Sequence, residues 1–144
     1  MNVYTLSSRT GRSHELLSQL VKCKQLTDFS ELEPEDILVS MGYMKKIHSS
    51  VYKRAFTVNV HPGIGFPGRH PQLRALAILD LEWTDVTLHR VQSDEYDQGE
   101  HLARVVVNVT EKDRDDPNAF FERTRRIGVY LTAAWLIGQG AEMR

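Results

Sequence analysis

The chain has 144 residues, and its 18 Lys and Arg residues against 19 Asp and Glu residues give a formal net charge of −1. This near balance excludes a protein that binds nucleic acid through a large excess of positive charge. Hydrophobic residues make up 41% of the sequence and charged residues 26%, a mixture typical of a folded domain and not of a disordered chain. The length predicts a single domain over residues 1–144.

Cysteine content and apolar patterning predict the compartment. Cys23 is the only cysteine, which excludes an intrachain disulfide and a zinc site built from several cysteines. No uninterrupted apolar run approaches the roughly 20 residues that cross a bilayer, and residues 1–5 lack the pattern of a signal peptide. We therefore expect a cytoplasmic protein with no membrane or nucleic-acid partner, in which Cys23 is a buried small apolar residue.

The first half of the chain alternates predicted strands with predicted helices. Apolar residues recur at helical spacing after Ser13, which is a candidate N-cap. A continuous apolar run ends at Met41 and is typical of a strand buried on both faces. We expect strands at residues 2–6, 36–41 and 55–60, helices at 13–23 and 45–53, and a connector at 24–36.

The second half is predicted to hold a further helix, two neighbouring strands and a terminal helix. We expect the helix at residues 72–81, the strands at 84–91 and 101–109, and loops at 61–71 and 93–100. Asp116 and Pro117 are a favourable helix start, and Gly138 or Gly140 is expected to end that helix. Its core-facing stripe is predicted to be Phe120, Ile127, Tyr130, Leu131, Ala134 and Ile137.

The order of these elements predicts the fold class. Strands that alternate with helices, followed by neighbouring strands, favour an α/β domain with a mixed, mostly parallel sheet flanked by helices. Trp83 and Trp135 are expected to be packing residues of this domain.

Residues 63–68 form a G-x-G-x-x-G pattern after a predicted strand. A dinucleotide site requires these glycines to open a helix whose N-terminus meets a pyrophosphate. Pro67 and Pro71 interrupt the segment, and Pro71 has no amide donor. The sequence therefore favours an irregular loop that uses the conformational freedom of glycine.

Asn59 and His61 stand two residues apart at the end of a predicted buried strand. The strand period of two directs both side chains to the same face, and ligands bind at the carboxyl ends of strands in open α/β sheets. An imidazole can transfer protons near neutral pH, and an amide can donate to a developing oxyanion. The alternative is that both side chains satisfy backbone groups in a proline-rich turn.

The predicted loop at residues 93–100 carries four acids and no basic residue. Such a run is usually a solvated loop. Asp97, two residues before Gly99, is instead a candidate carboxylate that would favour the imidazolium form of His61 and orient its ring.

Four segments of the chain, in this order, resemble the folate-dependent formyltransferases, a family that includes glycinamide ribonucleotide, methionyl-tRNA and amino-sugar N-formyltransferases. The resemblance is strongest over residues 32–110, and four segments in order are more specific than any one motif. They are Ile37 to Met44, Asn59 to Pro62, Asp85 to Val91 and Asp97 to Glu100.

The resemblance implies a formyltransferase-like domain that moves a formyl group from N10-formyltetrahydrofolate to the amine of a small molecule, without a metal. It implies that Asn59, His61 and Asp97 form the catalytic set. His89 matches a further family position, for which we favour packing or hydrogen bonding. The implied folate-binding residues are Met41, Gly42, Tyr43, Met44, Asp94 and Gly99. Because a shortened sheet leaves apolar surface for a second copy, we also expect a homodimer.

The chain also departs from the family pattern. Residues 63–67 replace the family's Ser-Leu-Leu-Pro loop, and the glycine-rich turn that binds phosphate in the ribonucleotide enzymes has no clear counterpart. No counterpart of the domain that contacts tRNA is present either, so the sequence argues against ribonucleotide and tRNA acceptors. Two other functions stay open: hydrolysis of the formyl-folate by the same residues, and a shortened non-catalytic folate-binding or interaction domain.

Overall fold

A mixed sheet forms the centre of the molecule. The computed structural model describes residues 1–7, 11–43, 45–62, 76, 81–93 and 99–144. Its strands are β1 (Val3–Ser7), β2 (Lys24–Gln25), β3 (Ile37–Met41), β4 (Phe56–Pro62), β5 (Trp83–Arg90) and β6 (His101–Asn108). Its helices are α1 (Arg12–Leu20), the 3₁₀ turn η1 (Phe29–Glu31), α2 (Ser49–Tyr52), α4 (Glu111–Asp115) and α5 (Pro117–Gly138).

The six described strands lie in the order β2-β1-β3-β4-β5-β6. β2, β1, β3 and β4 pair in parallel, whereas β4 with β5 and β5 with β6 pair antiparallel. The predicted mixed, mostly parallel α/β fold is thus confirmed, although the predicted connector at 24–36 contains β2 and η1. Only Leu76 and Leu81 of the predicted helix at 72–81 lie among the described residues, and Leu76 is fully buried. The predicted glycine loop at 63–68 lies outside them.

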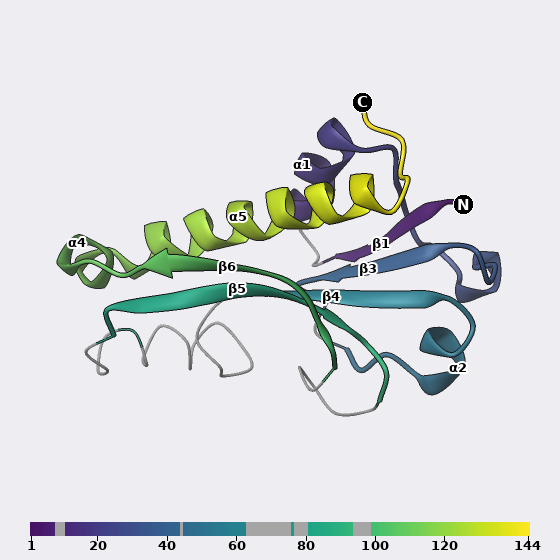
Figure 1. The fold of residues 1–144 in the computed structure, drawn as a ribbon, viewed down its shortest axis with the longest axis horizontal. Helices are drawn as coiled ribbons and strands as arrows, with labels where there is room; N and C mark the ends of the chain where they lie inside the picture. Colours follow the sequence, from purple (N-terminus) through teal and green to yellow (C-terminus); the bar gives the residue numbers. More distant parts are fainter. Residues whose placement is uncertain (8–10, 44, 63–75, 77–80, 94–98) are drawn as a thin grey trace.

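Two hydrophobic cores lie on opposite faces of the sheet. α5 crosses one face with α1 beside it, and α2 lies on the other (Figure 1). The main core joins α1 and α5 to alternate strand residues such as Val39, Val58 and Val86. The second core is smaller and lies around Leu38 and Val51. Because strand side chains alternate, β3 supplies both cores and all five of its residues are buried.

The predicted stripe of α5 is right in part: Phe120 is buried and Ile127 and Leu131 pack against the main core, whereas Tyr130, Ala134 and Ile137 are exposed. Tyr130 and Ile137, which were expected to face the core, are 47% and 38% exposed. Gly128 faces the strands, and a Cβ built there would lie 2.9 Å from Val60 Cγ2. In the middle of the helix, from Thr124 to Ala133, the buried residues are small or β-branched, because the helix backbone approaches the sheet closely there. The buried residues of α5 are Phe120, Phe121, Thr124, Gly128, Val129, Thr132, Ala133 and Leu136.

Two further predictions are wrong. The N-cap of α1 is Gly11, with a φ of 63° that glycine adopts without strain, and Ser13 is buried inside the first turn. The Ser13 hydroxyl instead accepts a hydrogen bond of 3.3 Å from Arg125 of α5. Trp83 is 52% exposed and does not pack in the core. Trp135 does pack there, stacked on Phe56 with 6.0 Å between ring centroids.

Cys23 lies in the main core, as expected for a small apolar residue. Burial raises the pKa of its thiol, which opposes formation of the nucleophilic thiolate. None of the helices in the described ranges is both long enough and apolar enough to cross a membrane.

Candidate functional site

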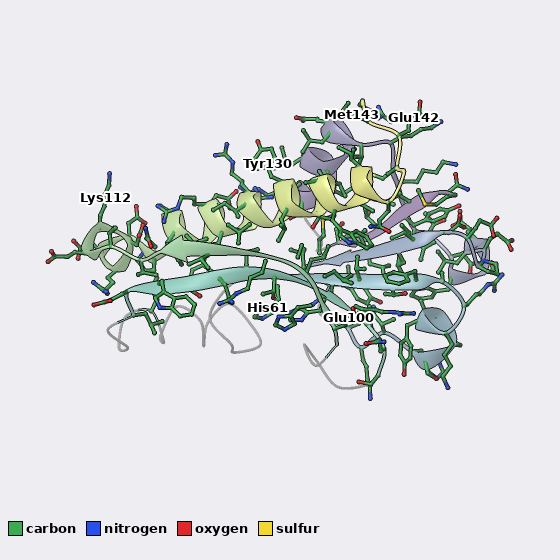
Figure 2. The ribbon with its side chains drawn as sticks, viewed as in Figure 1. His61, Glu100, Lys112, Tyr130, Glu142 and Met143 are labelled. Atoms are coloured by element: carbon green, nitrogen blue, oxygen red, sulfur yellow. The ribbon has the colours of Figure 1, made fainter. Side chains whose placement is uncertain are left out.

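β4 presents Asn59 and His61 on the sheet face opposite α5. Its alternate residues Val58 and Val60 enter the main core under α5, so the strand period directs Asn59 and His61 to the other side. Figure 2 shows His61 on that side of the sheet, whereas Tyr130 lies above α5. Both site residues are half-buried. The structure therefore brings the predicted pair together at the carboxyl end of a parallel strand, where ligands bind in open α/β sheets.

β5 adds a second polar pair beside the first. In the antiparallel register Asn59 lies opposite His89, and His61 lies opposite Thr87. Thr87 and His89 are each 5% exposed, and the Thr87 hydroxyl and His89 Nε2 are 2.6 Å apart in a hydrogen bond. The predicted packing and hydrogen-bonding role of His89 is thus confirmed. Because its ring is fixed by this bond and by burial, His89 offers a rigid surface to its neighbours.

Three imidazoles form a row on this face of β4, β5 and β6. The ring centroids of His61 and His89 are 6.5 Å apart with an interplanar angle of 67°. The centroids of His89 and His101 are 4.5 Å apart at 84°. His101 is exposed, so the row runs from solvent, through the buried His89, to the half-buried His61.

β3 completes the polar surface with Ser40. Ser40 lies opposite Asn59 in the parallel register of β3 and β4, and it is only 2% exposed. The polar surface therefore spans three adjacent strands at the point where parallel pairing changes to antiparallel pairing. It offers an amide, an imidazole and hydroxyls, which can donate to an oxyanion and transfer protons.

Three of the predicted folate-binding residues follow one another at the end of β3. Met41 is 2% exposed and its side chain lies in the main core, on the face opposite Asn59, so the side chain does not reach a ligand on the Asn59 face. Gly42 is exposed and turns the chain with a φ of 68°. Tyr43 is half-buried against the second core. Their folate contact stays a prediction.

Gly99 lies where no side chain fits. A Cβ built on it would stand 1.5 Å from the carbonyl oxygen of Arg90, and the next residue, Glu100, accepts a hydrogen bond of 2.8 Å from the Arg90 amide. Glycine at this position therefore lets the chain pass close to the end of β5. The other predicted residues of this segment, Asp94 and Asp97, lie outside the described residues, as does Met44.

Sequence reasoning did not predict a site role for Ser40, Thr87 or His101. A usable signal was present, because Thr87 and His89 repeat on β5 the two-residue spacing of Asn59 and His61 on β4. Only the strand register aligns the two pairs. Within the described ranges, no three His, Cys, Asp or Glu side chains are grouped so that they could hold a metal ion.

Comparison with solved structures identifies the fold. Phosphoribosylglycinamide formyltransferase from Bacillus halodurans superposes with a TM-score of 0.67 at 18% identity, over 93% of this chain and 92% of that one. A formyltetrahydrofolate deformylase from Pseudomonas syringae gives 0.68 at 17% identity, over 94% of this chain and 60% of that one. HypX from Aquifex aeolicus in complex with tetrahydrofolic acid gives 0.60 at 22% identity, over 76% of this chain and 22% of that one.

No protein-family model matches the sequence, and no curated protein matches it. The chain therefore has the fold of the folate-dependent formyltransferases, as the sequence resemblance implied, and the likeness is carried by structure at low sequence identity.

Proposed function

We propose that this protein transfers a formyl group from N10-formyltetrahydrofolate to the amine of a small molecule. The observation that carries the proposal is the placement of Asn59 and His61 side by side on one face, at the carboxyl end of β4. The same fold in formyltransferases, and in a protein solved with tetrahydrofolic acid, supports it.

The proposed reaction has simple requirements. The amine nitrogen attacks the formyl carbon, and the carbonyl oxygen becomes an oxyanion in a tetrahedral intermediate. The bond from that carbon to N10 of the folate then breaks, N10 gains a proton, and the amine nitrogen loses one. A site that accelerates these steps needs a donor for the oxyanion and a group that moves protons near neutral pH.

The described residues meet both requirements. The Asn59 amide is a neutral donor for the oxyanion, and the His61 imidazole takes the proton from the amine or returns it to N10. Thr87 and His89 lie opposite this pair and hold the β5 side of the face rigid through their hydrogen bond. Asp97 is proposed to orient His61, as the family resemblance implies.

A single substitution tests the proposal. His61→Ala is expected to lower turnover at least about a hundredfold, because positioned acid–base groups typically contribute 10² to 10⁴. Formyl transfer is measured as the release of tetrahydrofolate from the donor, with each amine of a panel as the acceptor. Lys112→Ala is the control, because Lys112 is exposed on α4, far from His61 (Figure 2). If the wild type transfers the formyl group and the His61→Ala variant does so with comparable turnover, the proposed mechanism is contradicted.

Hydrolysis of the formyl-folate to formate is the second candidate. It is favoured by the fold shared with a formyltetrahydrofolate deformylase. Here water would replace the amine as nucleophile, with the same proton transfers. Formate release that needs no amine, and that His61→Ala abolishes, would replace the transferase proposal. Folate binding without either reaction would instead identify a non-catalytic folate-binding domain.

A further inference from the structure

β5 and β6 extend beyond the end of β4. Within the described residues, the pairing of β4 with β5 extends to Pro62 opposite Val86, whereas β5 begins three residues earlier, at Trp83 opposite Asn108 of β6. Figure 1 shows this two-stranded extension reaching past β4, with the first turns of α5 over one of its faces. The opposite face belongs to the same side of the sheet as His61, because Trp83, Asp85 and Thr87 alternate along β5.

That face carries an open hollow of about 560 Å³, lined by Glu82, Trp83, Arg104, Val106 and Asn108. Trp83 is 52% exposed and Val106 is 58% exposed, an unusual degree for large apolar side chains on adjacent strands. The Arg104 Nε donates to Asp85 Oδ2 at 2.6 Å, and its guanidinium carbon lies 5.6 Å from the Trp83 ring centroid. The indole is thus held beside an ion pair and still presents its surface to solvent.

The lining groups specify a ligand chemistry. An exposed indole offers a flat apolar surface, on which the C–H face of a saturated ring packs as well as an aromatic ring does. Glu82 and Asn108 add a carboxylate acceptor and a carboxamide that both donates and accepts, which suits hydroxyl groups. Among the described residues on this part of the face, two carboxylates, Glu82 and Asp85, stand against the guanidinium of Arg104, a balance that disfavours a phosphate group.

The hollow lies within reach of the proposed site. Thr87 is directly opposite His61, and Trp83 is four residues away along β5, about 13 Å at the usual rise of a strand. We infer that the Trp83 hollow binds the far end of the acceptor, a hydroxylated ring without phosphate, in a molecule whose amine lies at His61. The inference rests on the proposed function and adds the class of acceptor to it.

The experiment compares glucosamine with its β-1,4-linked trimer, which is long enough to reach from His61 to Trp83. With N10-formyltetrahydrofolate as donor, Trp83→Ala is expected to raise KM for the trimer about tenfold, the loss of one good aromatic contact. Its kcat for the trimer and its KM for glucosamine are expected to stay unchanged. Tyr130→Ala is the matched control, since Tyr130 is an exposed aromatic residue on α5, on the opposite side of the sheet.

A binding measurement separates this inference from the proposed function. Without donor, the trimer is expected to change the tryptophan fluorescence of the wild type, and Trp83→Ala is expected to remove that change while Trp135 still reports an intact core. If the trimer binds at Trp83 but the protein transfers no formyl group, the hollow is supported as a binding site and the proposed transferase function is overturned. If formyl transfer to the trimer occurs and Trp83→Ala leaves its KM unaltered, the binding role of the hollow is overturned and the transferase function is not. Equal quenching of Trp83 fluorescence by glucosamine 6-phosphate overturns the selection against phosphate.

Discussion

The parallel and antiparallel halves of the sheet are buried to different extents. β3, in the parallel half, is buried along its whole length between the two cores. β6, at the antiparallel edge, has one buried residue, Val107, and exposes four of its eight residues. Among the described residues, the first half is packed on both faces, whereas β6 packs toward α5 on one face and leaves Arg104, Val106 and Asn108 exposed on the other. Asn59 and His61 lie on β4, between the two, where a rigid strand meets an open surface.

Core truncation in the two halves should have unequal effects. Leu38→Ala in β3 is expected to lower the free energy of unfolding by about 3 kcal/mol, because Leu38 is fully buried in the second core and a cavity would remain. Leu102→Ala in β6 removes the same atoms from a partly buried position and is expected to cost about 1 kcal/mol. Urea unfolding of both variants measures the difference. Equal losses would show that the halves do not differ in packing.

The contact between α5 and β4 allows a second test. A methyl group at Gly128 would stand 2.9 Å from Val60 Cγ2 and 3.3 Å from Val86 Cγ1. Gly128→Ala gains about 1 kcal/mol of helix propensity but overpacks at a typical cost of 1–3 kcal/mol. We expect a net loss of about 1 kcal/mol by urea unfolding. Turnover should also fall, about tenfold, because Val60 lies between Asn59 and His61 and a small displacement disturbs both.

A double substitution isolates the steric cause. Val60→Ala removes the nearer of the two methyl groups that Gly128→Ala would meet, so adding Gly128→Ala to that variant is expected to cost less than it costs in the wild type. It should also leave turnover at the level of Val60→Ala alone. If Gly128→Ala costs the same in both backgrounds, the close approach of α5 to Val60 does not position the site.

Local patterns in the sequence predicted most of the fold. The apolar run ending at Met41, the Asp116-Pro117 helix start and the valines of β6 each mark an element whose periodicity is visible without tertiary contacts. The stripe of α5 was predictable only in part: Phe120, Ile127 and Leu131 do pack on the main core. Apolarity favours Tyr130 and Ile137, but the closeness of the helix to the sheet selects Gly128 and Thr132, and that distance is a tertiary property.

The candidate site was also predictable from the sequence only in part. Spacing within one strand placed Asn59 and His61 on one face, and the structure places them there. Thr87 and Ser40 join them only through register, which pairs residues far apart in the sequence. The prediction for Trp83 was wrong, because this residue was expected in the core and is 52% exposed. It lies in a part of β5 and β6 that extends beyond the described end of β4.

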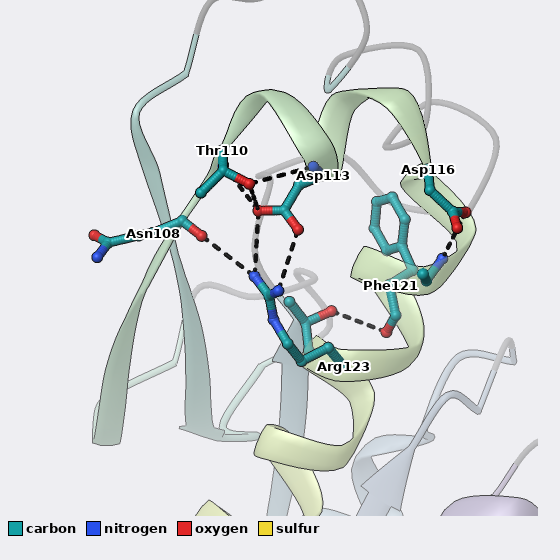
Figure 3. A network of polar contacts seen from close by, with 8 residues as sticks. Asn108, Thr110, Asp113, Asp116, Phe121 and Arg123 are labelled. Atoms are coloured by element: carbon teal, nitrogen blue, oxygen red, sulfur yellow. Dashed lines mark hydrogen bonds and ion pairs between the residues drawn. The ribbon is translucent and has the colours of Figure 1, made fainter.

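A polar network fastens α4 and α5 to the end of the antiparallel half (Figure 3). The Asp113 carboxylate accepts hydrogen bonds from the Thr110 amide at 2.8 Å and from Arg123 Nη1 at 3.1 Å. A second Arg123 nitrogen donates to the carbonyl oxygen of Asn108, the last residue of β6, at 3.4 Å. Burial alone would raise the pKa of Asp113, but the bonds from Thr110 and Arg123 outweigh it and lower the pKa below its ordinary value of 3.8.

Asp113→Asn is expected to lower the free energy of unfolding by about 1 kcal/mol at pH 7, because the amide keeps part of the cap but loses the charge-assisted bond to Arg123. Since the folded-state pKa is lowered, the charged carboxylate stabilises the fold above its ordinary pKa of 3.8, and this contribution is lost as the pH falls through the folded-state value. The difference in unfolding free energy between wild type and variant should therefore be constant from pH 7 to about 5 and shrink toward pH 3. Urea titrations at each pH measure it, with Asp115→Asn, an exposed neighbour on α4, as the control. A difference that stays the same at pH 3 would mean that the Asp113 charge does not hold this corner to β6.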